Sequence, residues 1–120
     1  MNSTTINLGQ NFASGDFIAY NHNAASKHRI RVLANGQTTY FTSSLSKDEA
    51  VKIAVTATST SVSTFMNGNL ISSETINGNW SLADRFDTVI NELLGIIPLK
   101  QYMLFPTALS DDQCIALTQN

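Results

Sequence analysis

Acidic side chains and histidines decide whether this chain of 120 residues could carry out acid–base catalysis. Two carboxylates that flank a glycosidic bond can hydrolyse it, but most acids here stand in a predicted turn (Asp48, Glu49) or a helix first turn (Asp111, Asp112), where they favour the helix dipole. A nucleophilic site needs a positioned histidine, and both histidines lie in or beside a polar loop: His22 and His28. Neither a Gly-x-Ser-x-Gly motif nor a phosphate-binding loop occurs, so we predict that the chain is not an enzyme.

Oxygen ligands for a calcium ion could come from Asp84 and Asp87 with the nearby Asn77 and Asn79. The segment has no run of alternating aspartates, and it fits a surface turn with an ion pair equally well. The histidines are too isolated to suggest zinc, and the single cysteine, Cys114, excludes an internal disulfide or a site of several thiolates. We therefore predict no metal and no cofactor, and a buried Cys114 thiol on a helix.

Aromatic residues beside amides and hydroxyls are the side chains most suited to binding a saccharide, because a ring packs under the C–H face of a sugar while amides bond its hydroxyls. Trp80 follows Asn79 in a polar turn, Tyr20 precedes a polar loop, and Tyr40 stands among threonines. These four residues are candidate carbohydrate ligands. The alternative for Trp80 is a core position at the edge of the fold, since tryptophan is usually largely buried.

Arg29 and Arg31 belong to the one basic cluster of the chain and are two residues apart, so they point to the same face of a predicted strand. This pair is either part of a solvated sheet face or a contact for an acidic polysaccharide. The net charge of −2 produces no field that would recruit DNA or an anionic membrane. The longest apolar run is too short to span a bilayer, so we expect neither nucleic acid nor membrane insertion.

Short segments of β-branched and aromatic residues follow one another at turn signals, which predicts a mostly β chain. Two Asn-Gly pairs, Asn35-Gly36 and Asn67-Gly68, predict tight hairpins. A weak strand falls within residues 3–12, and Val89–Ile97 is an apolar run that could be a bulged strand. The stronger predicted strands are Asp16–Tyr20, Arg29–Leu33, Thr38–Thr42, Val51–Ala57, Val62–Met66, Leu70–Ile76 and Leu99–Phe105.

The chain ends in a predicted short helix over Ser110–Thr118, capped by Ser110 with Gln113 three residues later. We expect its apolar residues, Cys114, Ile115 and Leu117, to seal one end of the fold. Because no linker divides the sequence, residues 1–120 form one predicted domain. The strand count favours an all-β, antiparallel two-sheet sandwich over a closed barrel.

Two stretches resemble concanavalin A-like, laminin-G-like jelly-roll domains found at the C-terminal end of bacteriophage tail fibre and tailspike proteins. The first is the hairpin Val51–Ala57 with Val62–Ile71, where "IAV" leads to a strand ending in Asn-Gly. The second is the closing run Lys100–Thr118, which contains "FPTALSDDQ" before the helix. Such domains are generally longer than this chain, and the stretch Asp87–Ile97 is more apolar than is usual there.

This resemblance implies a jelly-roll sandwich, a virion setting outside the cell, and binding of bacterial surface polysaccharide. It also implies a fibre protein, so we expect a homotrimer. The alternative is a structural module that holds fibre subunits in register or assists their folding. In that case the apolar run Val89–Ile97 would be an interface between subunits.

Overall fold

Strands dominate the computed structural model, which describes residues 5–10, 15–76, 89–91 and 108–119. The predicted strand Leu99–Phe105, Asn79, Trp80 and the possible calcium ligands Asp84 and Asp87 lie outside these residues. No helix within the described ranges is long and apolar enough to cross a membrane. The elements in chain order are β1 (Thr5–Gln10), β2 (Phe17–His22), β3 (Lys27–Ala34), β4 (Gln37–Ser46), β5 (Ile53–Ala57), β6 (Ser61–Met66), β7 (Asn69–Thr75), β8 (Val89–Asn91) and α1 (Asp111–Thr118).

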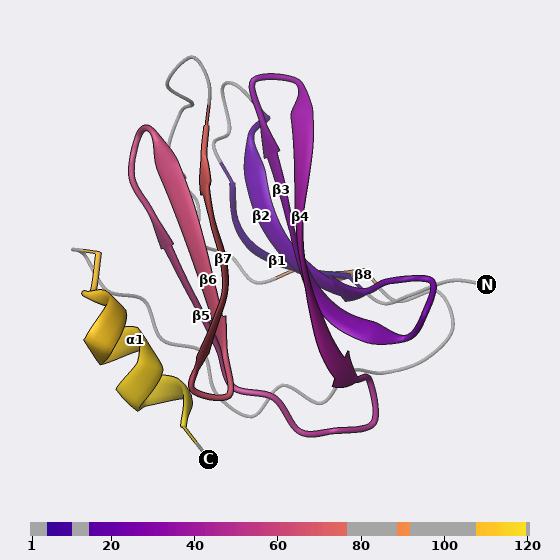
Figure 1. Cartoon of the computed structure of the whole chain (residues 1–120). Helices are drawn as coiled ribbons and strands as arrows, with labels where there is room; N and C mark the ends of the chain where they lie inside the picture. Colours follow the sequence, from indigo (N-terminus) through magenta and orange to yellow (C-terminus); the bar gives the residue numbers. More distant parts are fainter. Residues whose placement is uncertain (1–4, 11–14, 77–88, 92–107, 120) are drawn as a thin grey trace.

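The strands form two antiparallel sheets that pack face to face (Figure 1). The first sheet has the order β4-β3-β2-β1-β8, and the second has the order β5-β6-β7. Within each sheet most neighbours are consecutive along the chain, and β8 returns to pair with β1. The prediction of a mostly β chain with two antiparallel sheets and a short C-terminal helix is therefore confirmed.

Both predicted Asn-Gly hairpins are present. Asn35 and Gly36 have φ values of 52° and 77° and join β3 to β4, while Asn67 and Gly68 have φ values of 49° and 82° and join β6 to β7. Two consecutive residues with positive φ are the signature of a type I′ turn, whose twist matches that of paired strands. The sequence of these turns therefore sets the register of both hairpins.

The core lies between the two sheets and is built from alternate residues of their strands. On β3, residues alternate between half-buried and buried, so that Ile30 and Val32 point inward. They pack in one cluster with Phe41 of the first sheet and with Val62 and Met66 of the second. Full burial of each such side chain contributes about 1.5–3 kcal/mol to folding. The face of the first sheet that points away from this core is called the outer face below.

A crossover of residues 47–52 carries the chain from the first sheet to the second. On one side, the Lys47 amide donates to the Ser26 carbonyl at 2.8 Å. On the other side, the Asn67 side chain accepts from the Lys52 amide at 2.8 Å and donates to the Ala50 carbonyl at 3.2 Å. The crossover is thus bonded to both sheets, which matters for the buried polar cluster described below.

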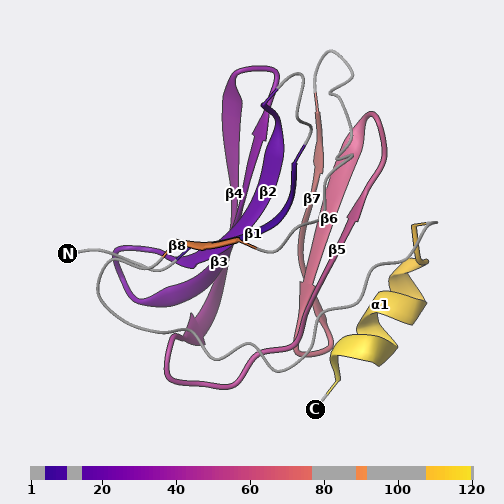
Figure 2. The same ribbon diagram turned by 180° about the vertical axis from the view of Figure 1, so that it is seen from behind.

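Helix α1 packs on the side of the second sheet that faces away from the first (Figures 1 and 2). The predicted capping box is present, because Ser110 Oγ accepts from the Gln113 amide at 3.2 Å while Gln113 Oε1 accepts from the Ser110 amide at 2.9 Å. Cys114 is buried, as expected. The prediction that Leu117 helps to seal the fold is wrong, since this side chain is 44% exposed.

The polar residue Thr118 is buried against the second sheet, where Leu117 was expected. It is 2% exposed, and its hydroxyl donates to the Cys114 carbonyl at 2.8 Å and accepts from the Gly68 amide at 3.0 Å. Because Thr118 lies four residues after Cys114, the two share one helix face. The helix is therefore fixed to the second sheet by the buried Cys114 and to the β6–β7 turn by the hydrogen bond of Thr118.

Candidate functional site

The outer face of the first sheet collects the predicted arginines and one predicted tyrosine. Antiparallel register places Arg29 opposite Asn21 and Thr42, and Arg31 opposite Ala19 and Tyr40. Residues directly opposite one another point to the same side of a sheet. Since Ile30 and Val32 between the arginines point into the core, the arginines point outward.

Arg29 and Tyr40 form the centre of this surface. The Arg29 guanidinium carbon lies 4.3 Å from the centroid of the Tyr40 ring, which is the arrangement of a cation–π contact. The Arg29 Nε also donates to Asn21 Oδ1 at 2.9 Å. These two contacts hold the guanidinium in one orientation, while Tyr40 remains 51% exposed.

Arg31 is less constrained. Its guanidinium carbon lies 5.3 Å from the centroid of the Phe17 ring, and its buried Nε has no hydrogen-bond partner within the described part of the chain. Neither arginine forms an ion pair with a described carboxylate, since the ion pair found among the described residues joins Lys47 to Asp48. We call the surface of Phe17, Asn21, Arg29, Arg31, Tyr40 and Thr42 the arginine face.

The predicted carbohydrate ligands are thus divided among three places. Arg29, Arg31 and Tyr40 come together on the arginine face. Tyr20 lies on the opposite side of the sheet, in the core cluster, and is 6% exposed. Its ring therefore cannot serve as a surface platform in this conformation. The other two candidates, Asn79 and Trp80, lie outside the described residues.

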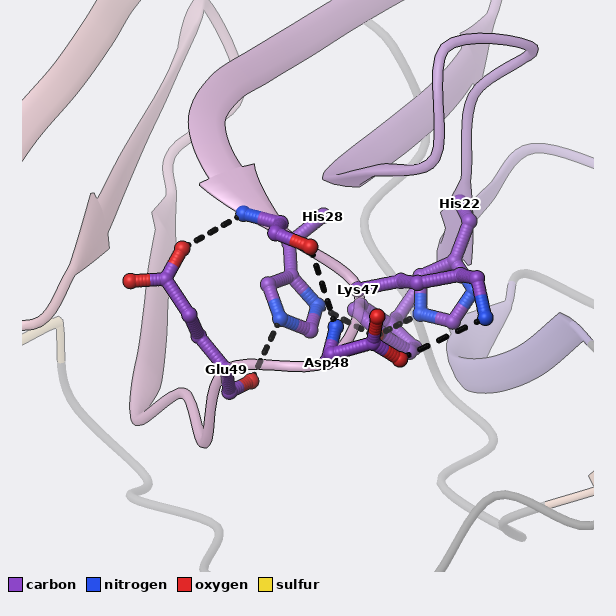
Figure 3. A network of polar contacts seen from close by, with 7 residues as sticks. His22, His28, Lys47, Asp48 and Glu49 are labelled. Atoms are coloured by element: carbon purple, nitrogen blue, oxygen red, sulfur yellow. Dashed lines mark hydrogen bonds and ion pairs between the residues drawn. The ribbon is translucent and has the colours of Figure 1, made fainter.

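A polar cluster lies where His22 and His28 of the first sheet meet the crossover (Figure 3), and the buried Tyr20 joins the two histidines. The Tyr20 hydroxyl is 2.6 Å from His28 Nδ1 and 2.8 Å from His22 Nε2, and His28 Nε2 is 2.8 Å from the main-chain carbonyl oxygen of Glu49 in the crossover. The two imidazole centroids are 5.3 Å apart. We call this chain of contacts, from His22 through Tyr20 and His28 to Glu49, the Tyr–His relay.

The direction of each bond in the neutral relay follows from the acceptor at its end. A carbonyl oxygen only accepts, so His28 Nε2 must carry a proton and donate to Glu49. In a neutral imidazole the other nitrogen, Nδ1, then accepts, and the Tyr20 hydroxyl donates its single proton to it. The hydroxyl oxygen is left as an acceptor, and His22 Nε2–H donates to it.

Burial favours the uncharged forms of two relay members. It raises the pKa of the Tyr20 hydroxyl to about 12 and lowers the pKa of His22, because a charged group loses hydration in the interior. Positive charge on His28 and Lys47 lowers the His22 pKa further, whereas Asp48 opposes this effect. The surroundings therefore favour the uncharged forms of Tyr20 and His22.

Sequence reasoning missed this cluster, although a signal for it was present. Tyr20 and His22 are two residues apart on one strand and so share a face. The loop that follows returns the chain so that His28 pairs with His22. The prediction that placed both histidines in or beside a polar loop left out this register.

No group of three or more histidine, cysteine or acidic side chains that could hold a metal ion occurs within the described ranges. In the relay itself, every imidazole nitrogen that points at Tyr20 is already engaged by the hydroxyl. No protein-family model, curated protein or solved structure matches the chain. Functional arguments therefore rest on the two sites described here.

Proposed function

We propose that this chain is a non-catalytic carbohydrate-binding module and that the arginine face is its binding surface. The observation that carries the proposal is the Arg29 guanidinium stacked 4.3 Å from the centroid of the half-exposed Tyr40 ring. An exposed ring offers a flat apolar surface to the C–H face of a sugar, and the guanidinium beside it donates to hydroxyl or carboxylate oxygens.

The charge on this surface favours an acidic saccharide. Arg29 and Arg31 lie side by side with no ion-pair partner among the described carboxylates, although the chain as a whole carries a net charge of −2. Arg31, whose guanidinium carbon lies 5.3 Å from the Phe17 ring centroid and which has no ion pair with a described carboxylate, is the proposed contact for a ligand carboxylate. Arg29, held by Asn21 and Tyr40, would instead shape the platform on which the sugar ring rests.

A bacterial surface polysaccharide is the ligand that agrees with both this charge and the resemblance to phage tail proteins. We therefore propose a C-terminal module of a tail fibre or tailspike, acting on the virion outside the cell. The proposed jelly roll gains support from the return of β8 to the side of β1, since a long connection back to the first strand is the step that closes a Greek key.

Titration calorimetry with purified acidic and neutral polysaccharides tests the proposal. We expect Tyr40→Ala to weaken binding of both by about tenfold, the value of one lost stacking contact, while Tyr40→Phe retains most of the affinity. Arg31→Gln should weaken only the acidic ligand, and that binding should decline as salt is added. The charge-matched control is Lys52→Gln, which removes one exposed positive charge near helix α1. The proposal would be contradicted by equal losses of affinity for the acidic saccharide in Lys52→Gln and Arg31→Gln. It would also be contradicted if no heat of binding were measured at millimolar saccharide.

A structural role in fibre assembly is the second candidate. Among the described strands, β8 stands at one edge of the first sheet, and the apolar run Val89–Ile97 begins with this strand. An edge strand presents unpaired backbone groups that can bond to another chain. We propose a homotrimer on this ground, and light scattering that finds a strict monomer at high concentration would refute it.

A further inference from the structure

The Tyr–His relay has no part in the saccharide site proposed above. Tyr20 lies in the core cluster, and His28 alternates with the outward-facing arginines along β3. Two histidines are nonetheless hydrogen-bonded to one buried hydroxyl at the point where the crossover meets the first sheet. Its chemistry is that of proton binding, because imidazole is the side chain that gains a proton between pH 5 and 8.

We propose that the relay is a proton-binding site that accepts one proton with every donor in it satisfied, whereas a second proton leaves the Tyr20 hydroxyl proton without an acceptor, sets two positive charges against each other and so loosens the crossover. The argument depends on the single proton of the Tyr20 hydroxyl. In the neutral relay this proton is donated to His28 Nδ1, and the hydroxyl oxygen accepts from His22 Nε2–H.

The first proton can enter at His22, which is half-buried and therefore the more accessible imidazole. It adds to Nδ1, so Nε2 keeps its proton and continues to donate to Tyr20. No bond of the relay changes direction. The contact of the crossover with His28 is not affected at this stage.

The same proton can also pass to His28 without rotation of any ring. The Nε2–H bond of His22 breaks as a new O–H bond forms on Tyr20, and the original O–H bond of Tyr20 breaks as Nδ1–H forms on His28. His22 is then neutral with its proton on Nδ1, and its Nε2 accepts from Tyr20. Both contacts of the Tyr20 hydroxyl are kept with their directions reversed, and the charged His28 still donates to the Glu49 carbonyl, in a stronger hydrogen bond.

A second proton cannot be bound with every hydrogen-bond donor of the relay satisfied. With both rings charged, His22 Nε2–H and His28 Nδ1–H both point at the hydroxyl oxygen, so the proton of Tyr20 loses its acceptor in the relay. The two positive charges would also face each other across 5.3 Å between ring centroids. We expect the repulsion between the two charges and the unsatisfied hydroxyl proton to displace the rings, and a displacement of His28 breaks its bond to Glu49.

The charged groups around the relay determine how strongly the second proton is opposed. Lys47 at the start of the crossover adds positive charge near His22, and Asp48 next to it partly compensates. The Lys47 amine is itself paired with Asp48 at 3.4 Å. The carboxylate of Glu49 is turned to the Ser46 amide, with which it forms a 2.7 Å hydrogen bond. The described surroundings therefore favour one added charge and not two.

Loss of the His28–Glu49 bond would remove the side-chain contact between the crossover and the buried part of the first sheet. The Lys47 amide would still donate to the Ser26 carbonyl at 2.8 Å. Within the turn, the Glu49 amide, the Asp48 amide and the Glu49 carboxylate keep their bonds to Ser46. The far end stays bonded to Asn67 of the second sheet. Amides of residues 47–49 should consequently report on the relay, whereas amides of β6 should not.

Nuclear magnetic resonance on the intact chain tests the proposal. We expect the imidazole signals to show two protons entering in separate steps more than about one pH unit apart. Amide hydrogen exchange at residues 47–49, corrected for its intrinsic pH dependence, should stay constant through the first step. It should become about tenfold faster at the second step, as expected for the loss of one hydrogen bond, while β6 serves as the internal reference.

The Tyr20→Phe variant separates the relay from simple charge repulsion, because it keeps the ring and removes the hydroxyl. We expect the two steps to move closer together in this variant and the exchange of residues 47–49 to lose its dependence on the second step. Steps of unchanged separation in Tyr20→Phe would overturn the proposal. Should that variant fail to fold, the wild-type titration decides: simultaneous uptake of both protons, or exchange that is unchanged at the second step, overturns it equally.

Discussion

Two buried threonines should respond in opposite ways to the same substitution. Thr118 is 2% exposed, and its hydroxyl accepts from the Gly68 amide at 3.0 Å and donates to the Cys114 carbonyl at 2.8 Å. Thr64 is 0% exposed, and its hydroxyl has no partner within the described residues. Replacement of either threonine by valine exchanges a hydroxyl for a methyl group at nearly constant volume, so the difference between the sites is one of hydrogen bonding.

The expected magnitudes follow from the bonds that each site makes. Thr118→Val leaves the Gly68 amide without its acceptor, which should lower the free energy of unfolding by about 1–3 kcal/mol. Thr64→Val removes an unsatisfied buried hydroxyl and should raise the free energy of unfolding by about 1 kcal/mol. For a domain of this size each kcal/mol corresponds to a change of roughly 3–6 °C in Tm.

Urea denaturation followed by circular dichroism measures both changes, and an unaltered m-value shows that the denatured state is the same. Thr64→Ser is the control, because it keeps the hydroxyl and deletes a methyl group, so it should destabilise the protein where valine stabilises it. A Thr64→Val variant that loses more than about 1 kcal/mol would refute the reasoning, as would a Thr118→Val variant as stable as the wild type.

Two further predictions concern the turn beneath the helix and the buried phenol. Gly68→Ala should destabilise the protein more than Gly36→Ala. Both glycines have positive φ, but of the two only Gly68 would place a Cβ against a neighbour, Gln119 Cγ at 3.0 Å. We expect a loss of about 1–2 kcal/mol at Gly36 and a larger loss at Gly68, and equal changes of Tm in the two variants would contradict this contact. Between pH 10 and 12 the unfolded chain loses the Tyr20 proton while the folded chain retains it, because burial raises the pKa to about 12, so stability from this group falls as the pH rises. The stability difference between wild type and Tyr20→Phe should accordingly narrow by about 1–2 kcal/mol over that range, and a constant difference in alkaline urea titrations would contradict the assignment.

Local signals predicted most of the strands. A tight hairpin turn requires positive φ at two successive residues, and Asn-Gly adopts this conformation more readily than most residue pairs. The two Asn-Gly pairs therefore located both hairpins correctly. Alternation along β3 correctly placed Arg29 and Arg31 on one face, because a period of two residues is a property of the extended chain itself.

Contacts between distant segments were beyond the reach of these signals. Tyr20 is buried inside the sandwich because its face of β2 meets the second sheet. The six residues of β2 do not indicate which of their two faces does so. On α1, Cys114 was correctly predicted to be buried, but Leu117 was not, because hydrophobicity favoured it whereas Thr118 is buried and accepts a hydrogen bond from the Gly68 amide. Such a bond is specified by tertiary geometry and leaves no periodic pattern in the sequence.

The bond between Gly68 and Thr118 joins residues 50 positions apart, and this separation has a kinetic consequence. The β6–β7 hairpin is local and can close within microseconds, whereas docking of α1 requires closure of a long loop and a finished hairpin to dock on. We therefore expect the helix to add its contacts after the main barrier to folding. On this expectation the helix prolongs the lifetime of the folded state, because contacts that form late slow unfolding and leave the folding rate nearly unchanged.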